Sequence, residues 1–426
     1  MGRVKLVAGA AVAVTAWLAF VVYSGLNGQW MSSVAAPDDV DGFAQYAVNA
    51  LTQNNQGSSA FVLIEAGRIV SQYHASADNA VDSNTVFAAA SMSKWFAAYA
   101  MMKLIEDGRA DLDVPVSHYL TRWQLPASEF GNDGVTIRRL LSHTAGFADG
   151  LGFGDYDAQE QLPSLEAALS RPRASSDRQV IVGVSEAPGT QWQYSGASYL
   201  LLELLIEEIS QRTFERFVDE TIFEPLGMLH AGYDHLDSYG NNAGTYTADG
   251  ERIQSYKYAS SAATGLVISS ADLARFLLSQ IEAMEVQGSL KAATLSKMRE
   301  PHGKNSGFDI WGLGTILYAP TANGDFVFGH DGANDPAINT AARINPDTGD
   351  ALIVLVSGHP AIATGIGSEW VLWQTGIPDV LASDAVFDSM LLPAIVGSVL
   401  ILFFVLVIGY RMRARRQSRS AGGSSA

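Results

Sequence analysis

The hydrophobic pattern of the chain has two long apolar runs, one near each end. The first covers residues 6–23 and follows Arg3 and Lys5, and the second covers residues 390–410 and precedes a tail with five arginines. Both runs approach the roughly 20 residues that a helix needs to cross a bilayer. We therefore predict transmembrane helices over residues 4–23 and 390–410, and a basic cytoplasmic tail over residues 411–426.

The N-terminal run also fits a secretory signal peptide, because a basic start and an apolar stretch are common to both kinds of segment. The small residues 33–35, Ser-Val-Ala, would then be the cleavage site. The apolar stretch is longer than a usual signal sequence, which favours an uncleaved anchor. Positively charged flanks stay in the cytoplasm, and basic residues lie outside both runs. In either case the central domain, residues 38–382, is predicted to face away from the cytoplasm.

Within the central domain, the pattern changes along the chain from strand to helix and back to strand. Residues 60–65 and 68–74, around an Ala66-Gly67 turn, predict a β-hairpin. Helices are predicted near residues 41–52, 164–171, 198–211, 213–223, 269–284 and 367–373, strands near residues 312–318, 326–329, 337–345 and 352–357, and a loop at residues 150–154. This order predicts an α+β fold of the α/β sandwich type. An antiparallel sheet assembled from both ends of the domain would be flanked by helices and interrupted by a mainly helical subdomain.

A further predicted helix, residues 91–107, is apolar on nearly all sides and ends before Gly108. Such a helix is typical of the interior of a large domain, so a charged residue in it requires an explanation. Ser91 begins the helix, and Lys94 follows three residues later on the same face. Burial lowers the pKa of a lysine, and a neutral lysine beside a hydroxyl is a base beside a nucleophile. The alternative is an N-cap serine followed by a solvated lysine.

The charge of the chain divides it in the same way as the hydrophobic pattern. All 44 acidic residues lie between residues 38 and 388, whereas seven of the 27 basic residues lie in the two tails, so the central part has a net charge of −24. Such a surface repels polyanions, which argues against a nucleic-acid partner. The chain has no cysteine, which excludes disulfides and thiol catalysis, and no His/Asp/Glu group has metal-ligand spacing.

Two further stretches have a chemically informative pattern. Residues 188–196, Pro-Gly-Thr-Gln-Trp-Gln-Tyr-Ser-Gly, directly precede a predicted helix, and residues 328–333, Phe-Gly-His-Asp-Gly-Ala, lie on a late strand. Together with residues 87–94, these ordered motifs resemble the serine β-lactamase and penicillin-binding protein superfamily. The pattern is most similar to the class C-like branch, which includes esterases, D-amino-acid peptidases and proteins called β-lactamase-related. The resemblance covers about residues 41–376, with supporting stretches at residues 140–146, 222–228 and 263–266.

The resemblance implies a serine hydrolase that acts through an acyl-enzyme and needs no cofactor. Ser91 would be the nucleophile, and Lys94 and Tyr194 would share the proton transfers. A phenol close to a lysine ammonium is expected to have a lowered pKa. The oxyanion hole would consist of the backbone N–H groups of Ser91 and Ala333. Gly332 would let an edge strand approach the substrate where a side chain would collide with it.

The expected substrate site consists of Gly196, His330, Asp331 and Gly332. The sequence departs from the family pattern at the first three of these positions. Gly196 stands where an asparagine usually ends the second motif, so the amide that holds a β-lactam or peptide carbonyl is missing. His330 replaces the lysine of the usual Lys-Thr-Gly triplet, as in many esterase-like relatives. Asp331 replaces the hydroxyl residue and is expected to repel a substrate carboxylate. A Tyr-Gly-Asn triplet at residues 239–241 lacks the flanking motif and is interpreted as a coincidence.

These observations predict an integral protein of a bacterial cytoplasmic membrane with its catalytic domain on the extracytoplasmic, or periplasmic, side. It would cleave an ester or amide of a small-molecule or peptide substrate, as an esterase or D-amino-acid peptidase does. One alternative is a β-lactamase or a DD-carboxypeptidase-like penicillin-binding protein. Another is a catalytically silent domain that binds or senses cell-wall peptides. His143 is expected to be a structural residue at a helix end. The sequence does not determine the oligomeric state.

Overall fold

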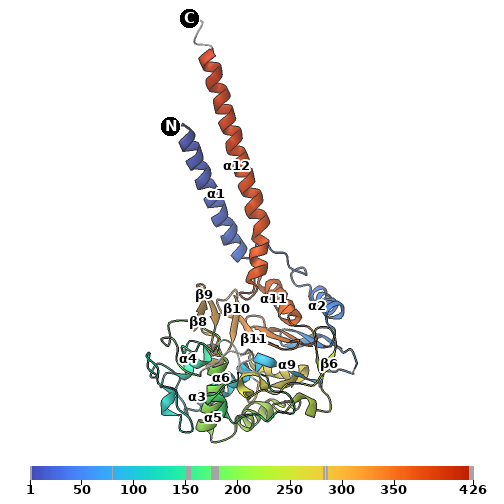
Figure 1. Ribbon diagram of the computed structural model, residues 1–426. Helices are drawn as coiled ribbons and strands as arrows, with labels where there is room; N and C mark the ends of the chain where they lie inside the picture. Colours follow the sequence, from blue (N-terminus) through green and yellow to red (C-terminus); the bar gives the residue numbers. More distant parts are fainter. Residues whose placement is uncertain are drawn as a thin grey trace.

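The computed structural model describes residues 2–78, 80–149, 155–173, 182–281, 284 and 286–421, and is organised around an eight-stranded antiparallel sheet (Figure 1). In spatial order the strands are β2 (Arg68–Ala75), β1 (Ser58–Glu65), β13 (Asp350–Ser357), β12 (Ile338–Asn345), β11 (Phe326–Asn334), β10 (Ile316–Pro320), β9 (Phe308–Trp311) and β8 (Gly303–Asn305). The N-terminal hairpin joins the C-terminal strands through β1 and β13, from the pair Ser58–Ser357 to the pair Ile64–Ala351. The prediction of a sheet assembled from both ends of the domain is therefore confirmed.

Strand β11 differs most from its prediction, because it continues to Asn334 and carries the third motif in extended backbone. β11 pairs with β12 along residues 328–334, but with β10 only along residues 326–329. Residues 330–334 thus have a strand neighbour on one side alone, although β11 lies inside the sheet and is not the edge strand that we expected. The short strands β8 and β9, which the sequence did not predict, form the edge instead.

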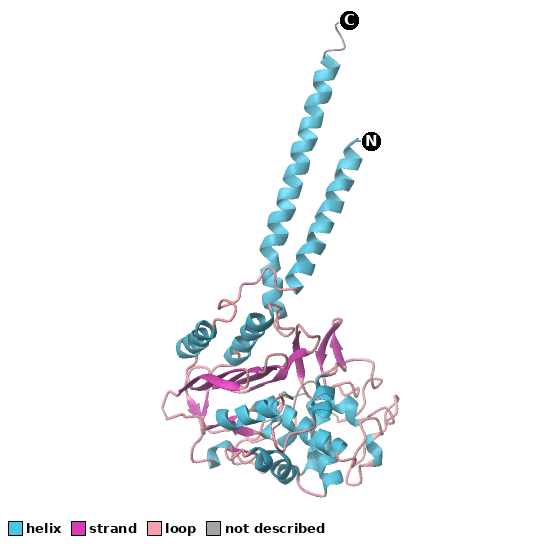
Figure 2. Cartoon of the chain, turned by 180° about the vertical axis from the view of Figure 1, so that it is seen from behind, coloured by secondary structure: helices cyan, strands magenta, loops and turns pink. Residues whose placement is uncertain are grey.

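Helices cover both faces of the sheet, as Figures 1 and 2 show. Helices α2 (Val40–Asn54) and α11 (Ile362–Thr375) pack on one face through a core that includes Phe61, Leu352 and Trp370. On the other face, alternate residues of the same strands, such as Val62 and Ile353, join a second core. This alternation follows from the two-residue period of a strand. It explains why β1 is buried along nearly its whole length.

The second core contains helix α3 (Ser93–Glu106), which is buried on all sides as its sequence predicted. Aromatic rings hold it against helix α9 (Ser270–Ser279), with Phe96 stacked on Phe276 at a centroid distance of 3.9 Å. The helix begins two residues later than expected, because residues Ala90–Met92 form a 3-10 turn, η1. Ser91 therefore lies in the turn that leads into α3.

The helical subdomain lies between the two halves of the sheet in sequence. Its other elements are η2 (Val116–His118), α4 (Ile137–Leu141), α5 (Leu165–Ser170), α6 (Gly196–Ser210), α7 (Phe214–Val218), η3 (Asp219–Phe223), α8 (Glu224–Leu226), η4 (Leu236–Ser238), η5 (Ser261–Gly265) and α10 (Ala292–Arg299). Two small sheets complete it, β3 (Val86–Ala88) with β7 (Val267–Ser269) and β4 (Ala231–Gly232), and β5 (Thr245–Tyr246) with β6 (Arg252–Ile253). The loop predicted at residues 150–154 lies outside the described residues.

Two long apolar helices, α1 (Gly2–Leu26) and α12 (Ser383–Ala421), extend side by side from the same side of the domain, with opposite chain directions (Figure 1). The Trp17 indole Nε1 donates a hydrogen bond to the Pro393 carbonyl at 3.1 Å and ties the two helices together. Residues 5–26 and 383–415 are each long and apolar enough to cross a membrane. α12 runs without a break from the domain into the basic segment, so the tail that we predicted as a separate unit is helical as far as Ala421.

Candidate active site

All eight residues that the sequence predicted for the site line a single cavity of about 570 Å³. They are Ser91, Lys94, Tyr194, Gly196, His330, Asp331, Gly332 and Ala333. These residues come from η1, α3, the start of α6 with the loop before it, and the second half of β11. The fold therefore brings together three motifs that are more than 90 residues apart in the chain.

Ser91 is positioned by a strained turn between β3 and α3. Ala90, directly before it, has a φ of +50°, a backbone conformation that costs a residue with a side chain on the order of 1–3 kcal/mol. Neighbouring groups hold this turn, since the Ser93 hydroxyl donates to the Ala90 carbonyl at 2.6 Å and the Thr340 hydroxyl donates to the Ala89 carbonyl at 3.0 Å. Strain of this kind is typical of sites where the fold fixes a reactive side chain.

Lys94 lies one turn after Ser91 and is almost completely buried. Its Nζ donates to the Ser91 Oγ at 3.2 Å and to the Ala263 carbonyl, in η5, at 2.8 Å. Burial disfavours the ammonium form and lowers the Lys94 pKa to about 7, although the negative charge of Asp149 opposes this shift. A large fraction of Lys94 is therefore neutral near pH 7, with its nitrogen in contact with the serine hydroxyl.

Tyr194 approaches the same serine from the loop before α6. Its hydroxyl is hydrogen-bonded to Ser91, and its ring centroid lies 5.0 Å from the Lys94 Nζ. Our expectation of a lowered Tyr194 pKa is wrong: the pKa is raised, because complete burial of the phenol outweighs the hydrogen bond from Ser91. The protonated tyrosine can donate a hydrogen bond or relay a proton. Lys94 is the better base of the two.

His143 packs against the loop that carries Tyr194. Its Nδ1 accepts a hydrogen bond from the Ser195 backbone N–H at 3.0 Å, and its ring lies 4.5 Å from the Tyr194 ring. His143 directly follows the C-cap of α4 and has a φ of +57°. Burial lowers its pKa, so it is neutral. These contacts agree with the structural role that the sequence indicated.

Asp149 is the charged group near Lys94 that the sequence analysis missed. It is buried, and its Oδ2 accepts a hydrogen bond from the Ala197 backbone N–H, in the first turn of α6, at 2.8 Å. A carboxylate at a helix N-terminus is stabilised by the free N–H groups and the helix dipole. Asp149 is separated from α6 by 48 positions in the chain, and no periodicity in the sequence links them.

Two side chains of β11 point to opposite faces of the sheet, as neighbouring residues on a strand do. His330 is buried in the cavity, and its Nδ1 lies 2.6 Å from the Asp331 carbonyl oxygen. Burial and the nearby Lys94 lower the pKa of His330 to about 3. The imidazole is thus neutral, with Nδ1–H donating to the carbonyl and Nε2 left as an acceptor that has no partner among the described residues.

The Asp331 side chain is held by an ion pair and a hydrogen bond. Its Oδ2 lies 2.7 Å from the guanidinium of the fully buried Arg343, and its Oδ1 accepts a hydrogen bond from the Tyr318 hydroxyl at 2.8 Å. Arg343 also pairs with Asp379. Arg343 thus holds the Asp331 carboxylate on the far side of β11 but shares its one positive charge between two carboxylates, so the expected repulsion of a substrate carboxylate by Asp331 stays a prediction.

Gly332 is required by packing against the turn before Ser91. A Cβ at this position would overlap with the Ala89 carbonyl oxygen and the Thr340 hydroxyl. The turn before Ser91 therefore excludes a side chain at this position, and the expected close approach of the substrate to Gly332 stays a prediction. Ala333 follows on the same strand, and Gly196 opens α6 with no side chain, so the amide that is usual in this motif is absent. Asn241 of the later Tyr-Gly-Asn triplet accepts a hydrogen bond from Thr85 and does not line the cavity.

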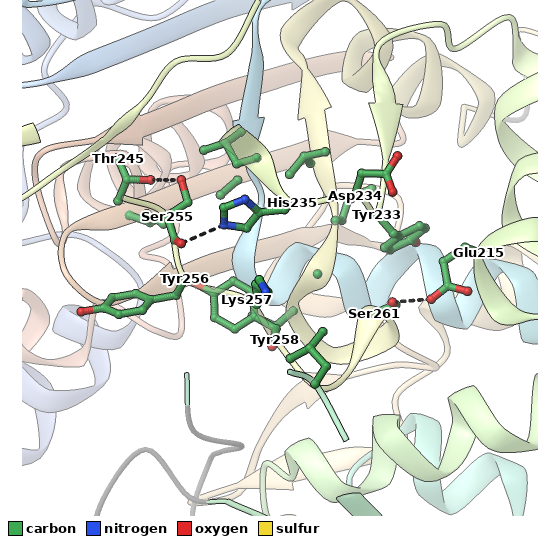
Figure 3. Close-up of a pocket in the computed structure, with 18 residues that line it drawn as sticks. Glu215, Tyr233, Asp234, His235, Thr245, Ser255, Tyr256, Lys257, Tyr258 and Ser261 are labelled. Atoms are coloured by element: carbon green, nitrogen blue, oxygen red, sulfur yellow. Dashed lines mark hydrogen bonds between the residues drawn. The ribbon is translucent and has the colours of Figure 1, made fainter. Parts of the chain in front are cut away.

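A second, more enclosed pocket of about 210 Å³ adjoins the first, with Tyr258, Thr264 and Ile338 lining both (Figure 3). The turn η5 separates the two: its Ala263 carbonyl holds Lys94, while its Ser261 side chain donates to Glu215 at 2.6 Å in the second pocket. The buried Glu203 fixes this turn by accepting hydrogen bonds from the Ser260 hydroxyl and the Ala262 backbone. Burial raises the Glu203 pKa to about 8.

Comparisons with known proteins identify the family of this chain. A family model described as Beta-lactamase matches residues 43–374. The chain belongs to this family. Proteins named "Putative D-alanyl-D-alanine carboxypeptidase" from Salmonella typhi and Salmonella newport are each 30% identical to it over 161 residues, which is 36% of this chain and 35% of theirs. The chain thus matches about a third of the length of these curated relatives.

Several solved structures have a similar fold. The octameric penicillin-binding protein homologue from Pyrococcus abyssi is similar with a TM-score of 0.63 and 24% identity, over 79% of this chain and 78% of the other. The β-lactamase/D-alanine carboxypeptidase from Pseudomonas syringae gives a TM-score of 0.62 and 17% identity, over 77% of this chain and 97% of the other. A D-stereospecific amidohydrolase from Streptomyces sp. is similar with a TM-score of 0.54 and 19% identity, over 74% of this chain and 93% of the other. At these identities the similarity shows the fold alone.

Proposed function

We propose that this β-lactamase family member is a serine hydrolase that cleaves an ester or amide through an acyl-enzyme on Ser91. The observation that carries the proposal is the contact between the Lys94 Nζ and the Ser91 Oγ at 3.2 Å, with the Lys94 pKa at about 7. A buried neutral amine next to a hydroxyl is a general base beside a nucleophile. The match of the family model over most of the chain supports the general class of reaction.

The proposed reaction follows from the positions of the side chains. Lys94 takes the Ser91 hydroxyl proton as Oγ attacks the substrate carbonyl carbon. The backbone N–H groups of Ser91 and Ala333 stabilise the negative oxygen that forms. The C–O or C–N bond then breaks, and the leaving group takes the proton from Lys94, directly or through Tyr194. A water molecule releases the acyl group by the reverse sequence of proton transfers and restores the Ser91 hydroxyl.

The experiment that tests this proposal is the intact mass of the full chain after exposure to a fluorophosphonate. We expect one adduct on the wild-type protein, no adduct on Ser91→Ala, and an unchanged adduct on Ser238→Ala, a control that removes an exposed serine hydroxyl. An adduct that persists in Ser91→Ala would contradict the assignment of the nucleophile. A wild-type chain that forms no adduct would favour the silent binding domain.

A second candidate, DD-carboxypeptidase activity, is favoured by the names of the Salmonella relatives. A peptide that ends in D-Ala-D-Ala has a carboxylate at the scissile end, and its recognition usually needs a cation. Lys94 is the only lysine or arginine among the described residues that line the cavity, and it already contacts Ser91 and Ala263. We therefore favour an esterase or a D-amino-acid peptidase over a carboxypeptidase or β-lactamase.

We also propose that α1 and α12 anchor the domain to a bacterial cytoplasmic membrane, with the domain on the outer side. Both helices are apolar, and their far ends carry the basic residues that usually stay in the cytoplasm. We expect the chain to remain in the membrane pellet after an alkaline carbonate wash. A chain released by this wash would contradict anchoring, and the intact mass would show whether residues 1–35 are retained.

A further inference from the structure

We infer that the carboxylates of Asp155 and Asp335 form a cation-binding subsite beside Ser91, so that the enzyme prefers substrates with a positively charged nitrogen near the scissile bond. This inference rests on the proposed hydrolase function and narrows its substrate class. Both carboxylates line the 570 Å³ cavity that contains Ser91 and Lys94. They belong to two segments far apart in the chain that the fold brings to one wall.

The two carboxylates are held at this wall by different elements. Asp335 follows the last residue of β11 and lies two positions after Ala333. Asp155 precedes Tyr156, whose backbone exchanges hydrogen bonds of 2.9 and 2.8 Å with Lys257. Burial and, to a smaller extent, the charge of Asp335 raise the Asp155 pKa to about 6, so the two acids are close enough to interact. Two carboxylates that line one cavity repel each other when both are ionised, and a cation between them would relieve this repulsion.

Lys94 and Arg173, two described cations near this wall, already have partners. The Lys94 Nζ contacts Ser91 and Ala263. Arg173, whose charge acts on Asp155, lies 2.8 Å from Glu160 and stacks over the Tyr156 ring at 4.7 Å. Among the described residues that line the cavity, no other lysine or arginine is available to neutralise the pair.

An unpartnered acceptor in the same cavity points to the same class of ligand. The Nε2 of His330 carries a lone pair and has no hydrogen-bond partner among the described residues, although the side chain is 99% buried. The imidazole is neutral, as its low pKa shows, so Nε2 can accept an N–H from a substrate but cannot pair with a carboxylate. Tyr258, labelled in Figure 3, adds an aromatic ring where the two pockets join. Aromatic faces attract cations.

The negative charge of this part of the cavity also disfavours an anionic substrate. Arg343 pairs with Asp331 on the far side of β11, and the negative wall consists of Asp155 and Asp335. These two carboxylates would repel the carboxylate of a penicillin or of a terminal D-alanine. Asp155 and Asp335 would thus add to the repulsion that we expected from Asp331. The inferred preference for a substrate without a free carboxylate agrees with the original expectation.

The test uses two fluorophosphonates that differ only in charge, one with a 2-(trimethylammonio)ethyl group and one with the isosteric, neutral 3,3-dimethylbutyl group. The second-order rate of Ser91 labelling is measured by intact mass on the full chain in a neutral detergent. We expect the cationic probe to react about tenfold faster or more, which corresponds to about 1.4 kcal/mol. Asp155→Asn and Asp335→Asn should each lower this ratio toward one by slowing only the cationic probe. Asp157→Asn, an exposed acid two positions from Asp155, should keep the ratio.

The possible outcomes distinguish the inference from the proposed function. Equal rates for the two probes on the wild-type chain would overturn the inference and leave the hydrolase proposal intact. A variant that slows both probes equally would also overturn it, because the loss would then be structural. Labelling that persists in Ser91→Ala, or no labelling of the wild type by either probe, would contradict the proposed function itself.

Discussion

Replacing Lys94 with glutamine is expected to slow the acylation of Ser91 by about 10²- to 10⁴-fold, the usual contribution of a positioned general base. Glutamine is of similar length and keeps a donor for the Ala263 carbonyl, but it cannot accept the Ser91 proton. The measurement is the rate of Ser91 labelling by a neutral fluorophosphonate. Lys103→Gln, on the same helix but paired with Asp107 near the surface, is the matched control and should react like the wild type.

The pH dependence of the same rate provides a second test of Lys94. Burial lowers the Lys94 pKa to about 7, and only the neutral amine can act as the base. The rate should therefore rise as the pH increases through about 7 and then become constant. The negative charge of Asp149 raises the Lys94 pKa, so Asp149→Asn should move the increase in labelling rate to lower pH. A rise centred near the ordinary lysine pKa of about 10.4 would contradict a buried neutral base.

Replacing Arg343 with methionine is expected to reduce the free energy of unfolding by about 3–5 kcal/mol. Arg343 is fully buried between the carboxylates of Asp331 and Asp379 and lies 3.9 Å from the Tyr318 ring centroid. Methionine would leave two buried carboxylates without their counter-ion. Because Asp331 belongs to β11, the change should also disturb the strand that carries His330 and Ala333. The measurement is denaturant unfolding of the full chain in detergent.

Two comparisons show whether this loss comes from the unpaired charges. The triple variant Arg343→Met, Asp331→Leu, Asp379→Leu removes the charges together and should recover much of the lost stability, because an apolar replacement of a buried ion cluster is often neutral or stabilising. Arg216→Met removes an exposed arginine that pairs with Glu220 and should change the stability little. If Arg343→Met were as stable as Arg216→Met, the buried cluster would not stabilise the fold.

The correct and incorrect predictions differ in the distance over which each interaction acts. The hairpin of β1 and β2, the buried helix α3 and the pairing of Ser91 with Lys94 depend on residues a few positions apart, and the sequence pattern predicted them. The three motifs resembled a known family, and the residues that carry them line one cavity. The strand pairing that left residues 330–334 of β11 open on one side depends on neighbours that the local pattern does not contain.

Electrostatics is the clearest case in which the sequence was not sufficient. The sequence showed that Tyr194 would be near a lysine, but not that complete burial would raise its pKa. It showed an aspartate at position 331, but not that Arg343 on the adjacent strand would form an ion pair with it.

The sequence by itself therefore determined the class of fold, the two apolar helices and the identity of the nucleophile and base candidates, because these follow from local periodicity and short motifs. Only the tertiary structure decided which charges are buried, which are paired and which face the cavity. Solvation and Coulomb interactions depend on distances between segments, and Asp155, Asp335 and Asp149 acquire their significance only when folding brings those segments together.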